Sequence, residues 1–310
     1  MKIEIKYPRA KPYFSKKMKD GILKDISGIL DSGMLTQGAY VAEFESRFKK
    51  EIGTDHAIAT SSCTSALEIA IKALKLKNTN ILVTTSFHII NSRSMRIIED
   101  CAHAHGATIN NMKAGSLGDV GCFSFYPTKI MATGEGGMIT TNNSEIAEQA
   151  DIYRNHGTTR NPQKVPGLDY GVTCHMPSQN YRMTEIAGIL GLYQLEQLSN
   201  FVESRRRVSD LYRKYLKNIP GVNLLPKHKG HSYWNFFIIL DKNINREEFA
   251  KILLHENGIQ TANAYSPAIH EQEMFKQYVT TLPIADDILS RHISLPMYVT
   301  LQEKDIHHIT

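Results

Sequence analysis

Stretches in which apolar residues recur every three to four positions alternate along the chain with short runs that are almost entirely apolar. Residues 16–32 show the first pattern, which places Ile22 and Ile29 on one face of a helix. A compact apolar run of four to eight residues is typical of a buried strand. The same reading predicts helices over residues 41–48, 66–74, 145–155, 184–198, 202–216 and 246–256, and strands over residues 56–59, 81–83, 97–100, 120–126, 138–141 and 231–240.

This alternation predicts an α/β protein with two domains. The chain has 310 residues, of which 42% are hydrophobic, enough for one large core and a smaller one. Strands and helices alternate up to residue 200, whereas the strand and helix beyond it form an α+β pattern. We therefore expect a large domain over residues 1–200 and a smaller domain over residues 201–310.

A single lysine follows the strand at 120–126. Pro127 closes that strand, and Lys129 comes before the glycine-rich stretch 134–137. Desolvation on an apolar support disfavours the charged ammonium, and a neutral amine can attack a carbonyl to form a Schiff base. Lys129 is therefore a candidate to carry pyridoxal phosphate. On this window alone, a solvated surface lysine is the more common explanation.

The strand at 97–100 ends in two carboxylates, Glu99 and Asp100. A pyridoxal enzyme needs an anion against the ring nitrogen, because the protonated pyridinium is the electron sink of the reaction. Asp100 can supply that anion. The two features together favour pyridoxal chemistry over a solvated lysine.

Four motifs follow one another in the chain: Glu-Asp-Cys-Ala-His-Ala-His-Gly at 99–106, Gly-Asp-Val-Gly-Cys-Phe-Ser-Phe-Tyr-Pro-Thr-Lys at 118–129, Gly-Glu-Gly-Gly-Met at 134–138 and Asn-Tyr-Arg-Met-Thr-Glu at 180–185. In this order they resemble the DegT/DnrJ/EryC1/StrS family of nucleotide-sugar aminotransferases. The resemblance implies fold type I of pyridoxal-phosphate enzymes, like aspartate aminotransferase. That fold has a large domain with a mixed seven-stranded sheet, a smaller α+β domain, and homodimers with shared active sites.

The resemblance assigns the cofactor phosphate to Cys63 and Thr64, at the start of a helix, and to Ser124. Free backbone N–H groups at a helix N-terminus bind anions. An ordinary helix N-cap is the alternative interpretation for Cys63 and Thr64, and a buried strand serine is the alternative for Ser124. The family commonly has glycine where Cys63 stands.

Further contacts come from the resemblance alone. His103 would lie near the phenolic oxygen of the cofactor, and Asn180 would reach the phosphate of the neighbouring subunit, although a capping asparagine is equally compatible. The family places an aromatic residue over the pyridine ring where Ile89 stands here, so the stacking contact departs from the pattern. His270 is a candidate substrate contact, and Asp286 is expected to be solvated.

The connection between the strands at 81–83 and 97–100 is unusually short. Parallel strands need a crossover of roughly a dozen residues or more, usually a helix, and residues 91–95 hold no helical pattern. The resembled family has a much longer segment here. Either the protein lacks that segment or the sequence omits it, and we expect an omission near residues 91–95.

Charge and composition exclude several other classes. A net charge of +5 would attract an anionic substrate but falls short of a nucleic-acid-binding signature. The four cysteines show no Cys-x-x-Cys spacing, the thirteen histidines show no metal-ligand pattern, and no Gly-x-Gly-x-x-Gly fingerprint follows a first strand. The sequence shows neither a signal peptide nor a run of ~20 apolar residues, so we expect a cytoplasmic protein that binds no metal, nucleic acid or membrane.

These observations predict a pyridoxal-phosphate-dependent aminotransferase. By family precedent L-glutamate is the donor and a nucleotide-linked keto-sugar, of the 4-keto-6-deoxy kind, is the acceptor. The product would be an amino sugar for surface polysaccharide, O-antigen or a glycosylated metabolite. Lys129 argues against the sugar dehydratases of the family, which have histidine there. A different pyridoxal reaction and a non-catalytic structural or regulatory homologue are the alternatives.

Overall fold

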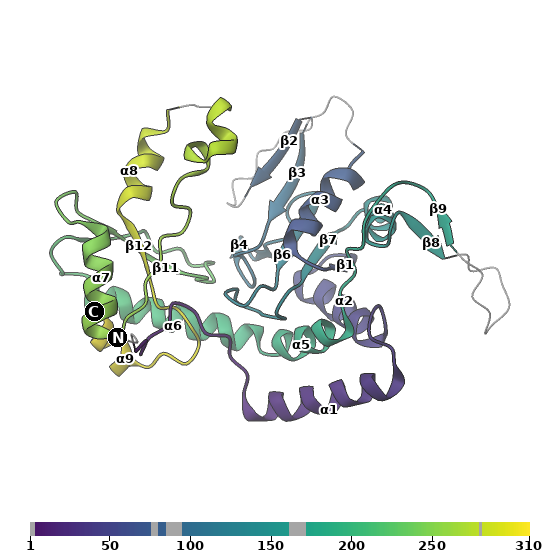
Figure 1. Ribbon diagram of the computed structural model, residues 1–310, viewed down its shortest axis with the longest axis horizontal. Coiled ribbons are helices and arrows are strands. Elements are labelled where there is room, and N and C mark those ends of the chain that lie inside the picture. Colours follow the sequence, from purple (N-terminus) through teal and green to yellow (C-terminus); the bar gives the residue numbers. More distant parts are fainter. Residues whose placement is uncertain (1–3, 76–79, 85–94, 161–171, 279–280) are drawn as a thin grey trace. The chain divides into compact units, whose positions relative to one another are not determined.

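The chain forms two compact units in the computed structural model, which describes residues 4–75, 80–84, 95–160, 172–278 and 281–310 (Figure 1). The first unit spans Phe14–Asn200. The second combines Met1–Tyr13 with Phe201–Thr310. Each unit contains its own sheet.

The first thirteen residues belong to the second unit, which differs from the expected large domain of residues 1–200. The backbone N–H groups of Lys6 and Tyr7 donate to the carbonyl of Gly258, and the N–H of Gln260 donates back to the carbonyl of Tyr7. Hydrogen bonds between segments so far apart in sequence have no signature in a local pattern.

The sheet of the first unit has five strands in the order β1-β7-β6-β3-β2. Strands β2, β3 and β6 run parallel, whereas β7 is antiparallel to β6 and to β1, so the sheet is mixed. In the described residues this sheet thus has five strands, whereas seven are expected. The strands are β1 (His56–Thr60), β2 (Asn80–Thr84), β3 (Met95–Asp100), β6 (Val120–Ser124) and β7 (Gly137–Thr141).

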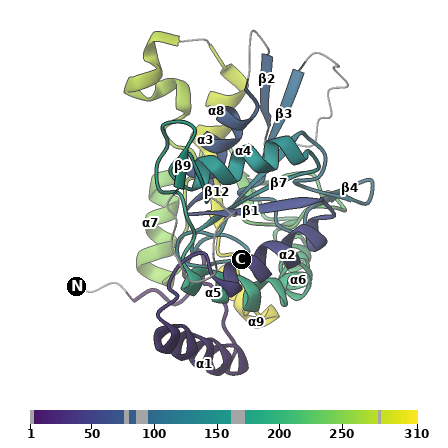
Figure 2. The same ribbon diagram turned by 90° about the vertical axis from the view of Figure 1, so that its right-hand side faces the viewer.

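Helices cover both faces of this sheet. Side chains alternate along β6, so that Val120 and Cys122 join Ile98 in the core beneath α3 (Cys63–Ala73) and α4 (Ser144–Arg154). Phe123 points to the other face, where it packs against Phe48 of α2 (Ala39–Ile52). Helix α2 packs against α5 (Glu185–Leu195), which in turn contacts α1 (Lys16–Ser32). Figures 1 and 2 show α2 and α4 on opposite sides of β1.

Two small antiparallel ladders complete the first unit. One pairs β4 (Thr108–Ile109) with β5 (Met112–Lys113). The other pairs β8 (Thr158–Arg160) with β9 (Val172–Cys174).

The second unit holds a three-stranded antiparallel sheet in the order β10-β11-β12. The strand expected over 231–240 begins only at Phe236, because Tyr233 has a positive φ of 53° that breaks the extended backbone. Tyr212, Phe236 and Leu240 lie in its core. The elements are β10 (Val222–Leu224), β11 (Phe236–Leu240), β12 (His292–Leu295), α6 (Leu198–Leu216), α7 (Arg246–Asn257), α8 (Pro283–Arg291), α9 (Glu303–Ile309) and the short 3-10 helices Ile269–Glu271 and Glu273–Tyr278.

The described residues contain neither a membrane-spanning helix nor a metal-binding group. Those residues include no helix long and apolar enough to cross a membrane. Nor do they bring three or more His, Cys, Asp or Glu side chains together as a metal-binding group.

Candidate active site

Strand β3 directs its two terminal carboxylates to opposite faces of the sheet. Glu99 is buried on the α2 side, where its carboxylate accepts N–H groups from Gly115, Leu117 and Gly118 at 2.8–3.0 Å. Asp100, one residue on, is half-buried on the α3 side, and its Oδ1 accepts the N–H of Ala102 at 3.1 Å. Glu99 is therefore a structural residue, and Asp100 is the carboxylate available to a ligand on the α3 side.

Lys129 lies in a turn just beyond the carboxyl end of β6. Its backbone N–H donates to the carbonyl of Tyr126, and the N–H of Thr133 donates to the carbonyl of Phe125. Because β3 and β6 are parallel neighbours, the segments that follow them meet at one edge of the sheet. The Nζ atom of Lys129 accordingly lies 2.6 Å from Nε2 of His103, which follows β3.

Cys63 is the first residue of α3 and faces the same place. It is 8% exposed, and burial, reinforced by the Asp100 carboxylate, raises the pKa of its thiol to about 12, while Lys129 acts in the opposite direction. A side chain that is influenced by both charges lies near both. Cys63, Asp100 and Lys129 thus form one cluster, and the thiol in it is uncharged at neutral pH.

The N-terminus of α3 is pressed against the start of β7. Ser62 caps the helix in a capping box with Ser65. A Cβ atom on Gly137 would lie 2.3 Å from the carbonyl oxygen of Ser62, so only glycine permits this approach. Gly137 also pairs with Ser124 across the sheet, which brings that serine to the helix end.

This arrangement fits the phosphate and ring of pyridoxal phosphate. The first N–H groups of a helix have no intrahelical partner and carry the positive end of the helix dipole. Cys63 and Thr64 supply such groups beside Ser124, while Lys129 and Asp100 supply an amine and an anion on the same side of the sheet. The donor set matches a phosphorylated pyridine aldehyde.

Asn180 lies on an exposed segment that the backbone holds on both sides. The N–H of Tyr181 donates to the carbonyl of Arg154, and the N–H of Ser61 donates to the carbonyl of Tyr181. Asn180 itself forms an isolated antiparallel bridge with Asn155 and accepts the N–H of Arg182 through Oδ1 at 3.1 Å. Its segment is therefore fixed next to the loop that precedes α3.

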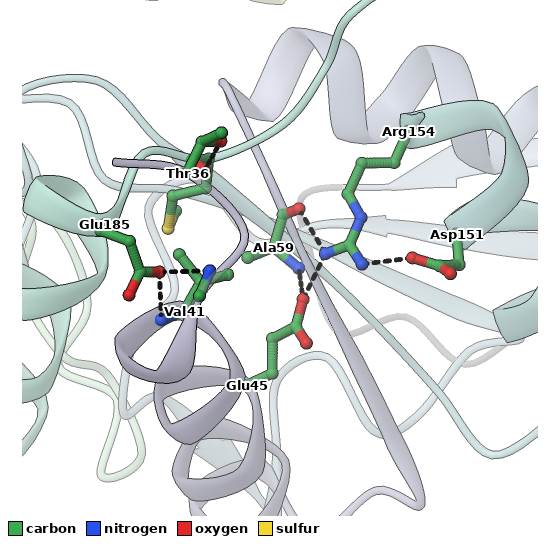
Figure 3. A network of polar contacts seen from close by, with 9 residues as sticks. Thr36, Val41, Glu45, Ala59, Asp151, Arg154 and Glu185 are labelled. Atoms are coloured by element: carbon green, nitrogen blue, oxygen red, sulfur yellow. Dashed lines mark hydrogen bonds and ion pairs between the residues drawn. The ribbon is translucent and has the colours of Figure 1, made fainter. Parts of the chain in front are cut away.

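Buried charges that the sequence patterns did not single out support these loops (Figure 3). Arg154 donates to Asp151, to the Glu45 carboxylate and, at 3.1 Å, to the carbonyl of Ala59 in β1. Glu185, 1% exposed, accepts N–H groups from Gly38, Tyr40 and Val41. Glu185 belongs to the motif at 180–185, which could have marked it as a structural residue. No local sequence pattern marks Arg154.

Two expected site residues lie outside the described part of the first unit. His270 lies in the second unit, where its Nε2 is 2.7 Å from Oδ1 of Asp286. The carboxylate of Asp286, which we expected to contact solvent, therefore also contacts a histidine. Ile89, the expected ring-stacking position, lies outside the described residues. Both assignments stay predictions.

Solved structures share this fold. PseC from Helicobacter pylori, an aminotransferase involved in the biosynthesis of pseudoaminic acid, matches with a TM-score of 0.86 and 23% identity over 98% of this chain and 96% of that one. The Escherichia coli GDP-4-keto-6-deoxy-D-mannose-3-dehydratase with bound hydrated pyridoxal phosphate matches with a TM-score of 0.85 and 22% identity, over 99% and 98% of the two chains. The chain therefore has fold type I of the pyridoxal-phosphate-dependent enzymes.

The family follows from the sequence. The model of the DegT/DnrJ/EryC1/StrS aminotransferase family matches residues 16–95 and 88–310, and the chain belongs to that family. A GDP-perosamine synthase of Escherichia coli O157:H7 is 31% identical over 71% of this chain and 58% of its own. The spore coat polysaccharide biosynthesis protein SpsC of Bacillus subtilis is 26% identical over 93% of this chain and 92% of its own.

The comparisons also bear on the short connection. The family match breaks into two pieces that overlap at residues 88–95. The alignment with SpsC spans 358 positions although it uses only 93% of the 310 residues here, so the relative has tens of residues without a counterpart. SpsC is therefore longer than this chain across the aligned part, and an omission near residues 91–95 stays our prediction.

Proposed function

We propose that the protein is a pyridoxal-phosphate-dependent aminotransferase that moves an amino group from L-glutamate to a nucleotide-linked keto-sugar. The observation that carries this proposal is the position of Lys129, whose Nζ is 2.6 Å from His103 Nε2 at the end of β6, in one cluster with Asp100. Membership of the family supports it independently.

Four residues would hold the phosphate and the ring of the cofactor. The N–H groups of Cys63 and Thr64, with the hydroxyl of Ser124, would bind the phosphate. Asp100 would face the ring nitrogen and keep it protonated, because a carboxylate there favours the charged pyridinium. When bound, pyridoxal phosphate supplies the electron sink for the reaction.

Lys129 has two tasks in this proposal. Its amine binds the cofactor covalently between turnovers. Once the amino donor has displaced it, the free amine would act as a general base that removes a proton from the substrate carbon. The same group would then act as a general acid that delivers this proton to the cofactor. The position of Lys129 in a turn just beyond β6, next to His103, supports this role.

The substrate assignment rests on the relatives. Curated relatives include GDP-perosamine synthases and a dTDP-3-amino-3,6-dideoxy-α-D-galactopyranose transaminase from Aneurinibacillus thermoaerophilus that is 33% identical over 71% of this chain. We infer a 4-keto-6-deoxy sugar nucleotide as acceptor and an amino sugar for polysaccharide, O-antigen or a glycosylated metabolite as product. The net charge of +5 would attract such an anion. His270 is our candidate contact to it.

The assembly and compartment are also inferred. The exposed position of Asn180 suits a residue that completes the phosphate site of a second subunit, and we propose a homodimer with shared active sites. All four cysteines are free thiols, which agrees with a reducing cytoplasm.

The visible absorbance of the purified protein with pyridoxal phosphate, before and after L-glutamate, tests this function. The wild type should develop the band of a lysine-bound cofactor, and glutamate should convert it to the amino form. Lys129→Ala should lose the band and the activity, whereas Lys75→Ala, which alters only a surface pair with Glu145, should keep both. Asp100→Asn should keep cofactor binding but lose on the order of 10² in transfer rate or more.

Other outcomes would point to the alternatives. A wild-type band that glutamate leaves unchanged, in the presence of a sugar-nucleotide acceptor, would indicate a different pyridoxal reaction. A folded dimer that binds no cofactor would indicate a non-catalytic homologue and would contradict the proposal.

A further inference from the structure

The contact between Lys129 and His103 requires one shared proton. An ammonium can only donate, and a doubly protonated imidazole can also only donate, so two charged groups could not approach to 2.6 Å as a hydrogen-bonded pair. If the ammonium of Lys129 donates, Nε2 of His103 is the acceptor and the ring proton lies on Nδ1. The contact thus excludes an ammonium that faces an imidazolium, and a donor amine paired with a neutral ring is the arrangement on which our proposal is built.

Backbone contacts on both sides hold the pair in place. His103 lies in a turn in which the N–H of Ala104 donates to the carbonyl of Cys101, and the N–H of Cys101 donates to the carbonyl of Cys122 in β6. The turn of Lys129 continues from the same strand. Both side chains are half-buried. The contact therefore joins two fixed positions.

Three titratable side chains from the neighbouring elements have other roles or are uncharged. Asp100, from β3, is the carboxylate that we propose to face the ring nitrogen of the cofactor. Cys63, from α3, has a thiol pKa raised to about 12 by burial and by Asp100, so it neither accepts nor gives a proton near neutral pH. Glu99 faces the other side of the sheet, bound to three backbone N–H groups.

We propose that His103 accepts the proton of Lys129 when this amine reacts with an aldehyde. The proton leaves Nζ for Nε2, and the nitrogen lone pair then forms the bond to the aldehyde carbon while the carbonyl pair moves to oxygen. His103 returns its proton to that oxygen, a second nitrogen proton follows it, and the oxygen leaves as water. This inference rests on the proposed function for the identity of the aldehyde. It gives His103 a role in the step that attaches the aldehyde to Lys129.

The test uses the cofactor-free protein and four variants. His103→Gln can still accept a hydrogen bond from the lysine but cannot take its proton, whereas His103→Ala can do neither. His56→Gln is the matched control, because His56 is a surface histidine bonded to Ser144 through Nε2. Lys129→Met removes the donor from the pair while keeping an unbranched side chain.

Two measurements separate the inference from the proposed function. Nitrogen NMR of histidine-labelled protein without cofactor should show His103 protonated at Nδ1 and not at Nε2 at neutral pH, and Lys129→Met should change that signal. The rate at which pyridoxal phosphate couples to Lys129, followed by absorbance, should fall by roughly 10²-fold in both His103 variants, the lower end of what a positioned proton acceptor contributes. Added imidazole should restore part of the rate in His103→Ala only.

A protonated Nε2 in the wild type, or a His103→Gln variant that couples as fast as the wild type and His56→Gln, would overturn the role of His103 and leave the aminotransferase proposal intact. If the NMR signature is present but the wild type does not couple the cofactor at all, the proposed function fails while the shared proton stands.

Discussion

A cysteine at the start of α3 shows how position determines the reactivity of a side chain. Thiols at helix N-termini usually have a lowered pKa, because the helix dipole favours the thiolate. Here burial and the neighbouring Asp100 outweigh that effect, and the pKa of Cys63 rises to about 12. Cys101 and Cys122, also buried near Asp100, have pKa values raised well above the ordinary one, with burial as the main cause.

The rate at which each cysteine is alkylated should depend on its burial and on the pKa of its thiol. With a pKa of about 12, Cys63 is thiolate in a fraction on the order of 10⁻⁴ at pH 8, and only the thiolate reacts. Exposed Cys174 should therefore react with iodoacetamide rapidly, and the three buried thiols should react only after denaturation. Peptide mass spectrometry of the native and denatured protein measures this. Fast modification of Cys63 in the native protein would contradict the burial described here.

The join between α3 and β7 depends on one glycine. Ser124, Gly137 and Thr60 form a row across the sheet, and the N-terminus of α3 lies against its middle residue. The proposed phosphate subsite therefore depends on the close approach of the helix end to the strand, which an intervening side chain would prevent.

Gly137→Ala should destabilise the protein by about 1–3 kcal/mol and weaken cofactor binding, because the new methyl group would meet the backbone of Ser62 and Cys63. Gly28→Ala is the control: it lies inside α1 with no atom within 4 Å of the added carbon, and it should be neutral or stabilising by up to about 1 kcal/mol. Urea unfolding measures both. Equal stabilities for the two variants would show that α3 can move away from β7 without cost.

Glu185 ties the turn before α2 to the start of α5. Besides its three accepted N–H groups, its own N–H donates to the carbonyl of Leu35, and Thr36 Oγ1 donates to the carbonyl of Met183. The turn at 35–38 is thus held to the segment that carries Asn180.

Glu185→Ala should cost about 3 kcal/mol or more in the free energy of unfolding, because it leaves backbone donors without a partner at a buried site. Glu196→Ala removes only an exposed ion pair with Arg47 and should cost less than about 1 kcal/mol. Thermal or urea unfolding of the two variants gives the comparison. A Glu185 variant as stable as the Glu196 variant would mean that water replaces the lost carboxylate.

At the scale of the whole molecule, the proposed homodimer would place Asn180 and Lys129 of one active site on different subunits. Asn180 is exposed on a segment that is held rigidly by Arg154 and Ser61. An exposed polar side chain on a rigid segment is well suited to a contact across a symmetric interface.

Mixing two inactive variants tests this arrangement. Lys129→Ala and Asn180→Ala should each be nearly inactive, but a mixture that has exchanged subunits should recover about a quarter of the wild-type activity, because half of randomly paired dimers contain one intact site. Size-exclusion chromatography verifies the exchange. A mixture no more active than its components would place Asn180 in the same site as its own Lys129, or in none.

The sequence alone determined the parts of this protein that depend on local order. Strand periodicity and the spacing of motifs placed Asp100 and Lys129 at the ends of strands, and because β3 and β6 are parallel neighbours, this was enough to bring them to one edge of the sheet. The family and the fold type followed from the same motifs. Those features survive in a linear pattern because each depends on residues close together in the chain.

Only the tertiary structure decided the rest. The packing of residues 1–13 with the second unit, the opposite faces of Glu99 and Asp100, the hydrogen bond between Lys129 and His103, and the support of the loops by Arg154 and Glu185 all join segments far apart in sequence. In the described residues the sheet of the first unit has five strands where seven were expected. Such contacts are set by how elements pack, which no local periodicity records.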